Sequence, residues 1–261
     1  MSQLRQGSPS QGRGDLDDSE PSTAAIEDRL RAIRPPSAVL DRAGERALTN
    51  RQREILAELD TMFGEGFAHL TMAEVASRLN CSLRTLYGLA PSRDALVLMV
   101  IDRKLWAIGR AARGALRADM SPLDAIRAYL AAANVAVSDA TPEFARDIAA
   151  MRQGRDLNEA HSNYLVKVTE CLLDLAVDGG DILPIDTAAV ARIIAGLGRE
   201  FARPEVLATL SSTPKEAADT MVDIIIAGLR TTAIDSGFDG TSAEPTREHS
   251  TDRSAVRGSQ P

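Results

Sequence analysis

Apolar residues recur every three or four positions from about residue 49 to residue 234, and no stretch alternates with the period of two that a half-buried strand requires. This pattern predicts an all-α protein of about nine helices. Polar capping residues mark where several helices begin, in two cases as capping boxes completed by Gln52 or Glu74. The capping residues are Thr49, Thr71, Ser82, Ser92, Ser121 and Thr141.

The C-terminal half contains three further helical patterns, over about residues 156–177, 186–202 and 213–234. The helix that Ser92 caps has apolar residues on more than one face, so we expect it to pack on two sides. The last two helices are rich in isoleucine and leucine. They are the predicted dimerisation surface, where a charge at Ile194 or Ile225 is expected to give monomers.

Composition separates both ends from this helical region. Residues 1–47 are predicted to be a mostly disordered extension with one short helical island at residues 24–33, because Gly, Ser, Pro, Gln and acidic residues dominate its start. Residues 237–261 have a similar composition and are predicted to be a disordered tail.

Residues 71–89 contain the most specific functional signal. Two short capped helices are joined at Asn80-Cys81 by a turn too short for antiparallel packing, which is the pattern of a helix-turn-helix. Such a motif places its second helix in the major groove of DNA. Asn80 is a residue type that tolerates the left-handed conformation this turn needs.

The first turn of the second helix offers side chains that can reach base edges. Arg84 can read guanine through two hydrogen bonds, which are worth about 1–3 kcal/mol of discrimination. Tyr87 and Thr71 can donate their hydroxyl protons to phosphates. The predicted DNA-binding residues are Arg51, Thr71, Ser82, Leu83, Arg84, Thr85, Tyr87 and Arg93.

The stretch from Ile55 to Leu96 resembles the DNA-binding domain of TetR-type transcriptional regulators. The positions that match in register are Ile55-Leu56, Phe63, Gly66-Phe67, Thr71, Val75-Ala76, Ser82, Leu86-Tyr87, Pro91-Ser92 and Leu96. The resemblance implies a helix-turn-helix DNA-binding domain over residues 48–96. It also implies a helical ligand-binding and dimerisation domain over 97–236, whose last two long helices pair with those of a second copy.

The chain departs from that pattern after Tyr87, where family members carry aromatic residues and this chain has Gly88-Leu89-Ala90. The loss of aromatic side chains is expected to weaken phosphate contact there. Arg93 supplies the basic residue usual after the cap, and Arg42 and Arg46 could add a basic arm.

The overall charge limits this interpretation without excluding it. Lys and Arg number 30 against 37 Asp and Glu, which gives a net charge of −7. DNA binding therefore depends on a local arrangement of arginines rather than on a basic chain. The chain has neither a secretory signal nor an apolar run long enough to cross a membrane, and these features predict a cytoplasmic protein that does not enter the membrane.

Candidate effector contacts lie between the fourth and the seventh predicted helices, from the helix that Ser92 caps to the one over about residues 156–177. The predicted ligand-binding residues are Arg103, Trp106, Tyr129, Phe144, His161 and Tyr164, although a residue of each of these types is more often ordinary core than a ligand contact. Few aromatics and many alanines favour a small, apolar effector. No cofactor or metal ion is predicted, because the two cysteines lie far apart and metal-ligand spacing is absent.

These features favour a homodimeric, ligand-responsive repressor that binds a palindromic operator in double-stranded DNA. The alternative is a helical protein with a degenerate helix-turn-helix that acts through protein partners. An enzyme is disfavoured, because the three histidines are scattered and no nucleophile or phosphate-loop motif is present. The salt dependence of DNA affinity distinguishes the repressor from the protein-binding alternative, since a DNA-binding protein loses affinity steeply as the salt concentration rises.

Overall fold

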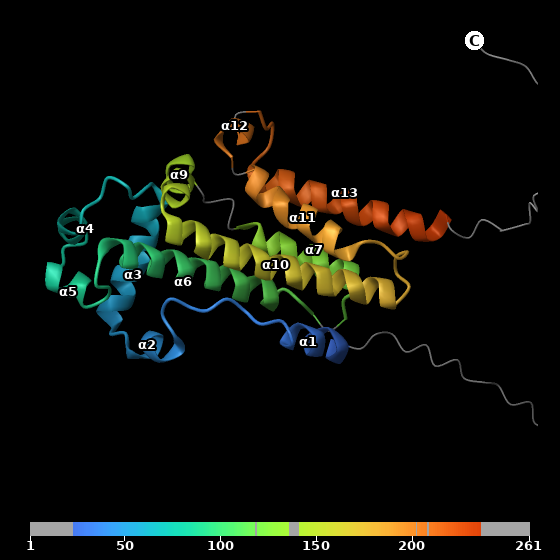
Figure 1. Ribbon diagram of the computed structural model, residues 1–261, viewed down its shortest axis with the longest axis horizontal. Coiled ribbons are helices and arrows are strands. Elements are labelled where there is room, and N and C mark those ends of the chain that lie inside the picture. Colours follow the sequence, from blue (N-terminus) through green and yellow to red (C-terminus); the bar gives the residue numbers. More distant parts are fainter. Residues whose placement is uncertain (1–22, 118, 136–140, 202, 208, 236–261) are drawn as a thin grey trace, which may run out of the picture.

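The computed structural model describes residues 23–117, 119–135, 141–201, 203–207 and 209–235 (Figure 1). Helices and the loops between them account for all of these residues, with no strand among them, so the predicted all-α class is confirmed. The nine predicted helices all have counterparts in these ranges. They are α3 (Asn50–Gly64), α4 (Met72–Arg78), α5 (Leu83–Tyr87), α6 (Arg93–Gly114), α7 (Pro122–Ala133), α9 (Pro142–Ala150), α10 (Arg152–Asp178), α11 (Thr187–Phe201) and α13 (Pro214–Asp235).

The predicted caps are formed. The side chains of Thr49 and Thr71 each accept from a main-chain N–H three residues on, and the side chains of Gln52 and Glu74 accept in return from the main-chain N–H of the cap residue. Ser82 and Ser92 cap α5 and α6 through their own side chains. These local contacts satisfy N–H groups that would otherwise have no partner at the helix ends.

Two separate apolar cores organise the chain. The first lies at one end of the molecule, where α3, α4, α5 and the first half of α6 enclose residues such as Ile55, Leu59 and Leu86, all fully buried (Figure 1). The second is formed by α7, α10, α11 and α13 around Ile126, Leu172 and similar residues. Helix α6 runs without a break past residue 96, where the predicted DNA-binding domain ends. It therefore connects the two cores.

Helix α9 packs on the first core although it follows α7 in the sequence. Phe144 on α9 meets the ring of Phe67 edge-on, with ring centroids 6.1 Å apart. Asp147 accepts from the main-chain N–H groups of Phe67 and Ala68, at 2.6 and 2.7 Å. The first core therefore extends beyond residues 48–96, the range predicted for the DNA-binding domain.

The segment from residue 23 to 47 contains the helical island predicted at residues 24–33, and it is more ordered than the rest of that prediction expected. Helix α1 (Thr23–Arg31) lies along α10, and its Ile26 and Leu30 are 4% and 2% exposed within the second core. A second short helix, α2 (Arg42–Ala47), is capped by Asp41. Burial of Ile26 and Leu30 offsets the entropy cost of ordering this polar segment. Residues 1–22 and 237–261, for which disorder is also predicted, lie outside the described residues.

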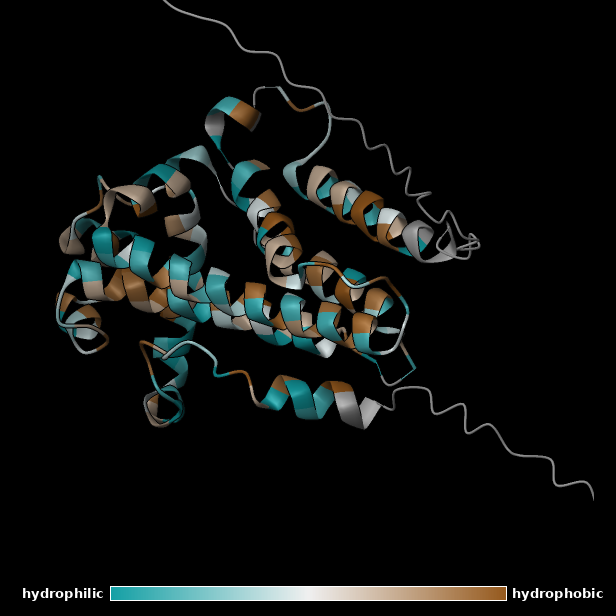
Figure 2. Ribbon diagram, turned by 45° about the vertical axis from the view of Figure 1, so that its right-hand side comes forward, coloured by the Kyte–Doolittle hydropathy of each residue, from teal (hydrophilic) through white to brown (hydrophobic). Residues whose placement is uncertain are grey.

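Helices α11 and α13 lie side by side on the opposite side of the bundle from α1, with the short α12 (Pro204–Leu207) near one end of the pair (Figure 1). Figure 2 shows apolar residues along both helices. Among the described residues, no helix is long and apolar enough to cross a membrane.

Candidate nucleic-acid interface and effector cavity

Helices α4 and α5 form the predicted helix-turn-helix. Asn80 has a φ of +46°, so it adopts the left-handed conformation that its residue type favours. The main-chain N–H of Cys81 then donates to the carbonyl oxygen of Ala76 at 3.0 Å. This closes the turn and sets α5 at an angle to α4, while Val75 and Leu86 hold both helices against the first core.

One side of α5 is open to solvent. Leu83 is 43% exposed and Tyr87 is 54% exposed, so both side chains project from the domain into solvent. Arg84 lies on the same short helix and is exposed, and its side chain has no hydrogen-bond or ion-pair partner among the described residues. These three side chains are therefore available to a partner outside the chain.

Most of the hydroxyl groups that are predicted to contact DNA form hydrogen bonds within the protein. Ser82 Oγ and Thr85 Oγ1 are 2.8 Å apart, and Ser82 also caps α5. Thr71 Oγ1 donates to a carboxylate oxygen of Glu74 at 2.7 Å. Hydrogen bonds from the main chain and side chain of Thr71 lower the pKa of the Glu74 carboxyl. Ser82, Thr85 and Thr71 thus set the shape of the helix-turn-helix before any contact with DNA.

Arg51 and Arg93 occupy structural positions in this chain. Arg51 donates to the carbonyl oxygen of Leu79 at 3.1 Å and pairs with two glutamates of its own helix. Arg93 donates from Nε to the carbonyl oxygen of Leu70 at 2.6 Å and from another nitrogen to that of Phe67. Its guanidinium also lies 5.9 Å from the centre of the Phe67 ring. Both arginines fasten the two ends of α4 to neighbouring helices, which the sequence pattern did not indicate.

Four of the six predicted effector residues line one cavity of about 800 Å³. Arg103, Trp106, His161 and Tyr164 reach it from α6 and α10, and its remaining walls come from α3 and residues 35–46. The other two predicted residues do not line this cavity. Tyr129 is 2% exposed in the second core, where burial raises the pKa of its hydroxyl, and Phe144 belongs to the first core.

A buried acid organises one wall of the cavity. Asp102 is 1% exposed, and its two oxygens are taken by the main-chain N–H of Val39 at 2.7 Å and by His161 Nε2 at 3.1 Å. The ring of Trp106 meets that of His161 edge-on, with centroids 5.8 Å apart. Sequence reasoning missed Asp102, although an acid directly after the apolar run 96–101 is a signal that could have indicated it.

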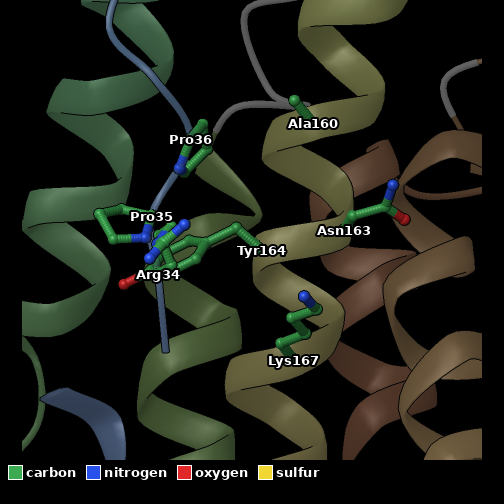
Figure 3. Close-up of a pocket in the computed structure, with 7 residues that line it drawn as sticks. All are labelled: Arg34, Pro35, Pro36, Ala160, Asn163, Tyr164 and Lys167. Carbon is green, nitrogen blue, oxygen red and sulfur yellow. The ribbon is translucent and has the colours of Figure 1, made fainter. Parts of the chain in front are cut away.

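A smaller hollow of about 200 Å³ lies between Arg34–Pro36 and α10 (Figure 3). Tyr164 extends from α10 toward Arg34 and Pro35, whereas Asn163 points away from them. Because Pro35, Pro36 and Tyr164 border both spaces, the hollow lies next to the larger cavity.

The candidate dimer surface lies on α11 and α13. Ile193 and Ile224 are 61% and 58% exposed, the two most exposed large apolar side chains among the described residues. Ile194, for which the sequence predicts a place on the dimer surface, is 3% exposed and belongs to the second core, and Ile225 is half-buried against that core. The exposed face is displaced by one residue on each helix.

Solved structures share this arrangement at low sequence identity. The SmeT–triclosan complex is 16% identical, with a TM-score of 0.59 over 77% of this chain and 100% of that one. A putative TetR-family transcriptional regulator from Rhodococcus sp. is 16% identical, with a TM-score of 0.56 over 70% of this chain and 100% of that one. The TetR-family transcriptional regulator PfmR from Thermus thermophilus is 20% identical, with a TM-score of 0.51 over 67% of this chain and 98% of that one. No family model and no curated protein matches the sequence.

These likenesses establish that the chain has the fold of TetR-family transcriptional regulators, a helix-turn-helix domain joined to a helical domain. The resemblance noted over residues 55–96 is thus confirmed at the level of the fold. The segment 23–47 covers one side of α6 and α10 and completes the cavity.

Proposed function

We propose that this chain is a homodimeric, DNA-binding transcriptional regulator that represses its target by binding a palindromic operator and releases it when a small molecule binds. The observation that carries the proposal is the open face of α5. Arg84, Leu83 and Tyr87 project from a helix-turn-helix whose hydroxyl side chains are engaged within the protein. A helix presented in this way fits the major groove, with Arg84 as the base reader.

The helix-turn-helix domain has no excess of basic residues, so the position of each arginine is important. Arg51 and Arg93 also make hydrogen bonds within the domain, so an arginine without such partners is the stronger candidate for an additional phosphate contact. Arg78, in the last turn of α4, is exposed, and its side chain has no hydrogen-bond or ion-pair partner in the part of the chain that the structure describes. We assign it to the sugar–phosphate backbone beside the groove that α5 enters.

Dimerisation through α11 and α13 supplies the second reader. Ile193 and Ile224 are exposed on two helices that pack against each other, which fits a two-fold contact with the same helices of a second copy. Two readers spaced about 34 Å apart would contact successive major grooves on one side of the duplex. An operator with two inverted half-sites follows from that symmetry.

The cavity beside α6 is the candidate effector site. The bound compound in the SmeT–triclosan complex, a structure of this fold, supports a small-molecule ligand for the present chain as well. A ligand promotes release only to the extent that it binds the released state more tightly than the DNA-bound state.

Selection of binding sites from a randomised duplex pool tests the DNA-binding part of the proposal. We expect a palindromic sequence to be enriched by the wild-type protein and to be lost with Arg84→Ala. Arg152→Ala is the matched control, because Arg152 is an exposed arginine of α10 outside the helix-turn-helix. Enrichment of the same sequence by Arg84→Ala would contradict the assignment of α5 as the reader. An absence of any enriched sequence would favour the alternative that the domain binds protein partners.

A further inference from the structure

The 800 Å³ cavity lies where three parts of the fold meet: the N-terminal segment 35–46, helix α3 of the DNA-binding domain, and helices α6 and α10. We propose that it binds an amphipathic organic anion, an apolar body that carries one carboxylate, and that the N-terminal segment covers this ligand. The volume is typical of cavities that bind small organic molecules, which span about 300–1,000 Å³.

The charge of the wall selects for an anion. Seven arginine and lysine side chains border the cavity, against three carboxylates. Each carboxylate already has a partner: Glu45 pairs with Arg103 at 2.6 Å, Asp60 with Lys104 at 3.8 Å, and Asp102 holds Val39 and His161. A further anion is therefore favoured in this space, and a cation is not.

Two donors on one face of α6 lack a partner among the described residues. The indole Nε1 of Trp106 is buried and makes no hydrogen bond, and a buried donor without an acceptor is costly to the protein. The guanidinium of Arg110 has neither a hydrogen bond nor an ion pair within the described ranges. Since the two residues are four positions apart on a helix, their side chains lie on the same face. A carboxylate beside Arg110 would accept from its exposed guanidinium, and it would accept from Trp106 as well once the indole ring turns its buried Nε1 toward the cavity.

The apolar part of the wall accounts for the body of the ligand. Leu56 of α3, Val100 and Leu105 of α6, and Pro35 and Pro36 of the N-terminal segment border the same space as the charged groups. Burying an apolar chain there stabilises the complex in proportion to the area removed from water. The composition of the chain favours a small, apolar effector. The cavity wall restricts this class of effector to molecules that also carry a charged group at one end.

Occupation of the cavity links the two cores. A ligand there touches α3, which belongs to the first core, and α10, which belongs to the second. The N-terminal segment is fixed at both ends, because Ile26 and Leu30 of α1 are buried against the second core and Arg53 of α3 donates to the carbonyl oxygens of Glu45 and Arg46. The role of the ligand in releasing DNA rests on the proposed function, whereas its binding does not.

The binding is tested on the full-length protein without DNA. Trp106 is the single tryptophan of the chain, so its fluorescence reports directly on the cavity. We would titrate straight-chain carboxylates from hexanoate to hexadecanoate, each beside the primary alcohol of the same length. At least one acid is expected to bind saturably with about tenfold higher affinity than its alcohol, as a charge-assisted hydrogen bond provides. The proposal is overturned if every acid binds no more tightly than its matched alcohol.

Two variants locate the site. Arg110→Gln is expected to lower the affinity for the preferred acid by about tenfold and to leave the affinity for the alcohol unchanged. Trp106→Phe, followed by calorimetry, is expected to weaken binding of the acid in the same direction, and Arg152→Gln is the surface control. Acid binding that is unchanged in both Arg110→Gln and Trp106→Phe would place the ligand elsewhere and overturn the proposal.

The DNA selection with Arg84→Ala and the comparison of acids with alcohols together distinguish failure of the ligand proposal from failure of the DNA-binding proposal. If Arg84→Ala abolishes selection of a DNA sequence but no acid binds in preference to its alcohol, the regulator assignment stands and the ligand class is wrong. If the acid binds as expected but no DNA sequence is enriched, the ligand site stands and the DNA-binding function is wrong.

Discussion

The main-chain N–H of Val39 donates a 2.7 Å hydrogen bond to Oδ2 of Asp102, and this contact joins the N-terminal segment to the middle of α6. The other carboxylate oxygen lies 3.1 Å from Nε2 of His161, so Asp102 connects the segment, α6 and α10. A buried carboxylate is retained in a protein interior only when its oxygens have partners of this kind.

Removal of that carboxylate is expected to destabilise the protein. Asp102→Ala leaves the Val39 N–H and the His161 ring without this partner, which should lower the free energy of unfolding by about 2–4 kcal/mol. Urea denaturation followed by circular dichroism measures the change. Asp178→Ala is the control, because its ion pair with Arg29 is exposed and should contribute less than about 1 kcal/mol. If the two variants have the same free energy of unfolding, the buried contacts of Asp102 contribute no more to stability than the exposed ion pair of Asp178 does.

Loss of the Arg93 side chain should lower the stability of the protein, whereas loss of the Arg84 side chain should affect DNA binding and leave the stability nearly unchanged. Arg93→Ala removes donors from the carbonyl oxygens of Leu70 and Phe67, so we expect it to lower the free energy of unfolding by about 1.5–3 kcal/mol. Arg84→Ala should change stability by less than about 0.5 kcal/mol, since its side chain is exposed and unpaired among the described residues. Thermal or urea unfolding of both variants decides this, and an Arg93→Ala protein as stable as the wild type would contradict its structural role.

The oligomeric state depends on which isoleucine is changed. Ile193→Asp and Ile224→Asp place a charge on the exposed apolar surface, and we expect folded monomers in sedimentation velocity experiments. Ile194→Asp should instead unfold the protein, because a lone carboxylate in the core cannot be solvated. Leu83→Asp is the matched control, being exposed on α5, and should remain a dimer. Dimers formed by both Ile193→Asp and Ile224→Asp would place the interface elsewhere.

Acid should weaken the contact between α7 and α13. Hydrogen bonds from Arg230 and Ser121 lower the pKa of the Asp124 carboxyl below its ordinary value of 3.8. A lowered pKa in the folded state means that the stabilisation is present above the unfolded pKa and is lost as pH falls through the folded one. Because Asp124 is half-exposed, we expect the effect to stay below about 1 kcal/mol.

The comparison that isolates this contribution is wild type against Asp124→Asn, unfolded in urea over a range of acidic pH. The wild type should be more stable above about pH 5, and the difference should shrink toward zero as pH falls. A difference that is the same at every pH would mean that the charge of Asp124 contributes nothing.

Local rules in the sequence predict the helices and most of their starts. Thr49, Thr71 and Asn80 act through neighbours within a few residues, so their roles can be read from spacing alone. Helix α10 shows the limit of this approach. It begins at Arg152 with no side-chain cap to mark the position, whereas the apolar pattern predicts a start near residue 156.

Contacts between distant parts of the chain cannot be predicted in the same way. The sequence predicts that Arg93 contacts DNA, which stays a prediction, but it gives no sign of the hydrogen bonds to Leu70 and Phe67, which lie 23 and 26 residues earlier in the chain. The hydrogen bond from Val39 to Asp102 beside the cavity likewise joins residues 63 positions apart. The exposed isoleucines also required the structure, because adjacent isoleucines leave the orientation of each helix undetermined until its packing is known.

Binding of the protein to a labelled duplex that contains the selected palindrome, followed by fluorescence anisotropy at several salt concentrations, tests the central claim most directly. We expect wild type and Arg152→Ala to bind with the same affinity, which falls steeply as salt rises, and Arg84→Ala to lose about tenfold or more of it. Binding by Arg84→Ala that equals the wild type, or an affinity that does not change with salt, would contradict the account of α5 as a reader of DNA.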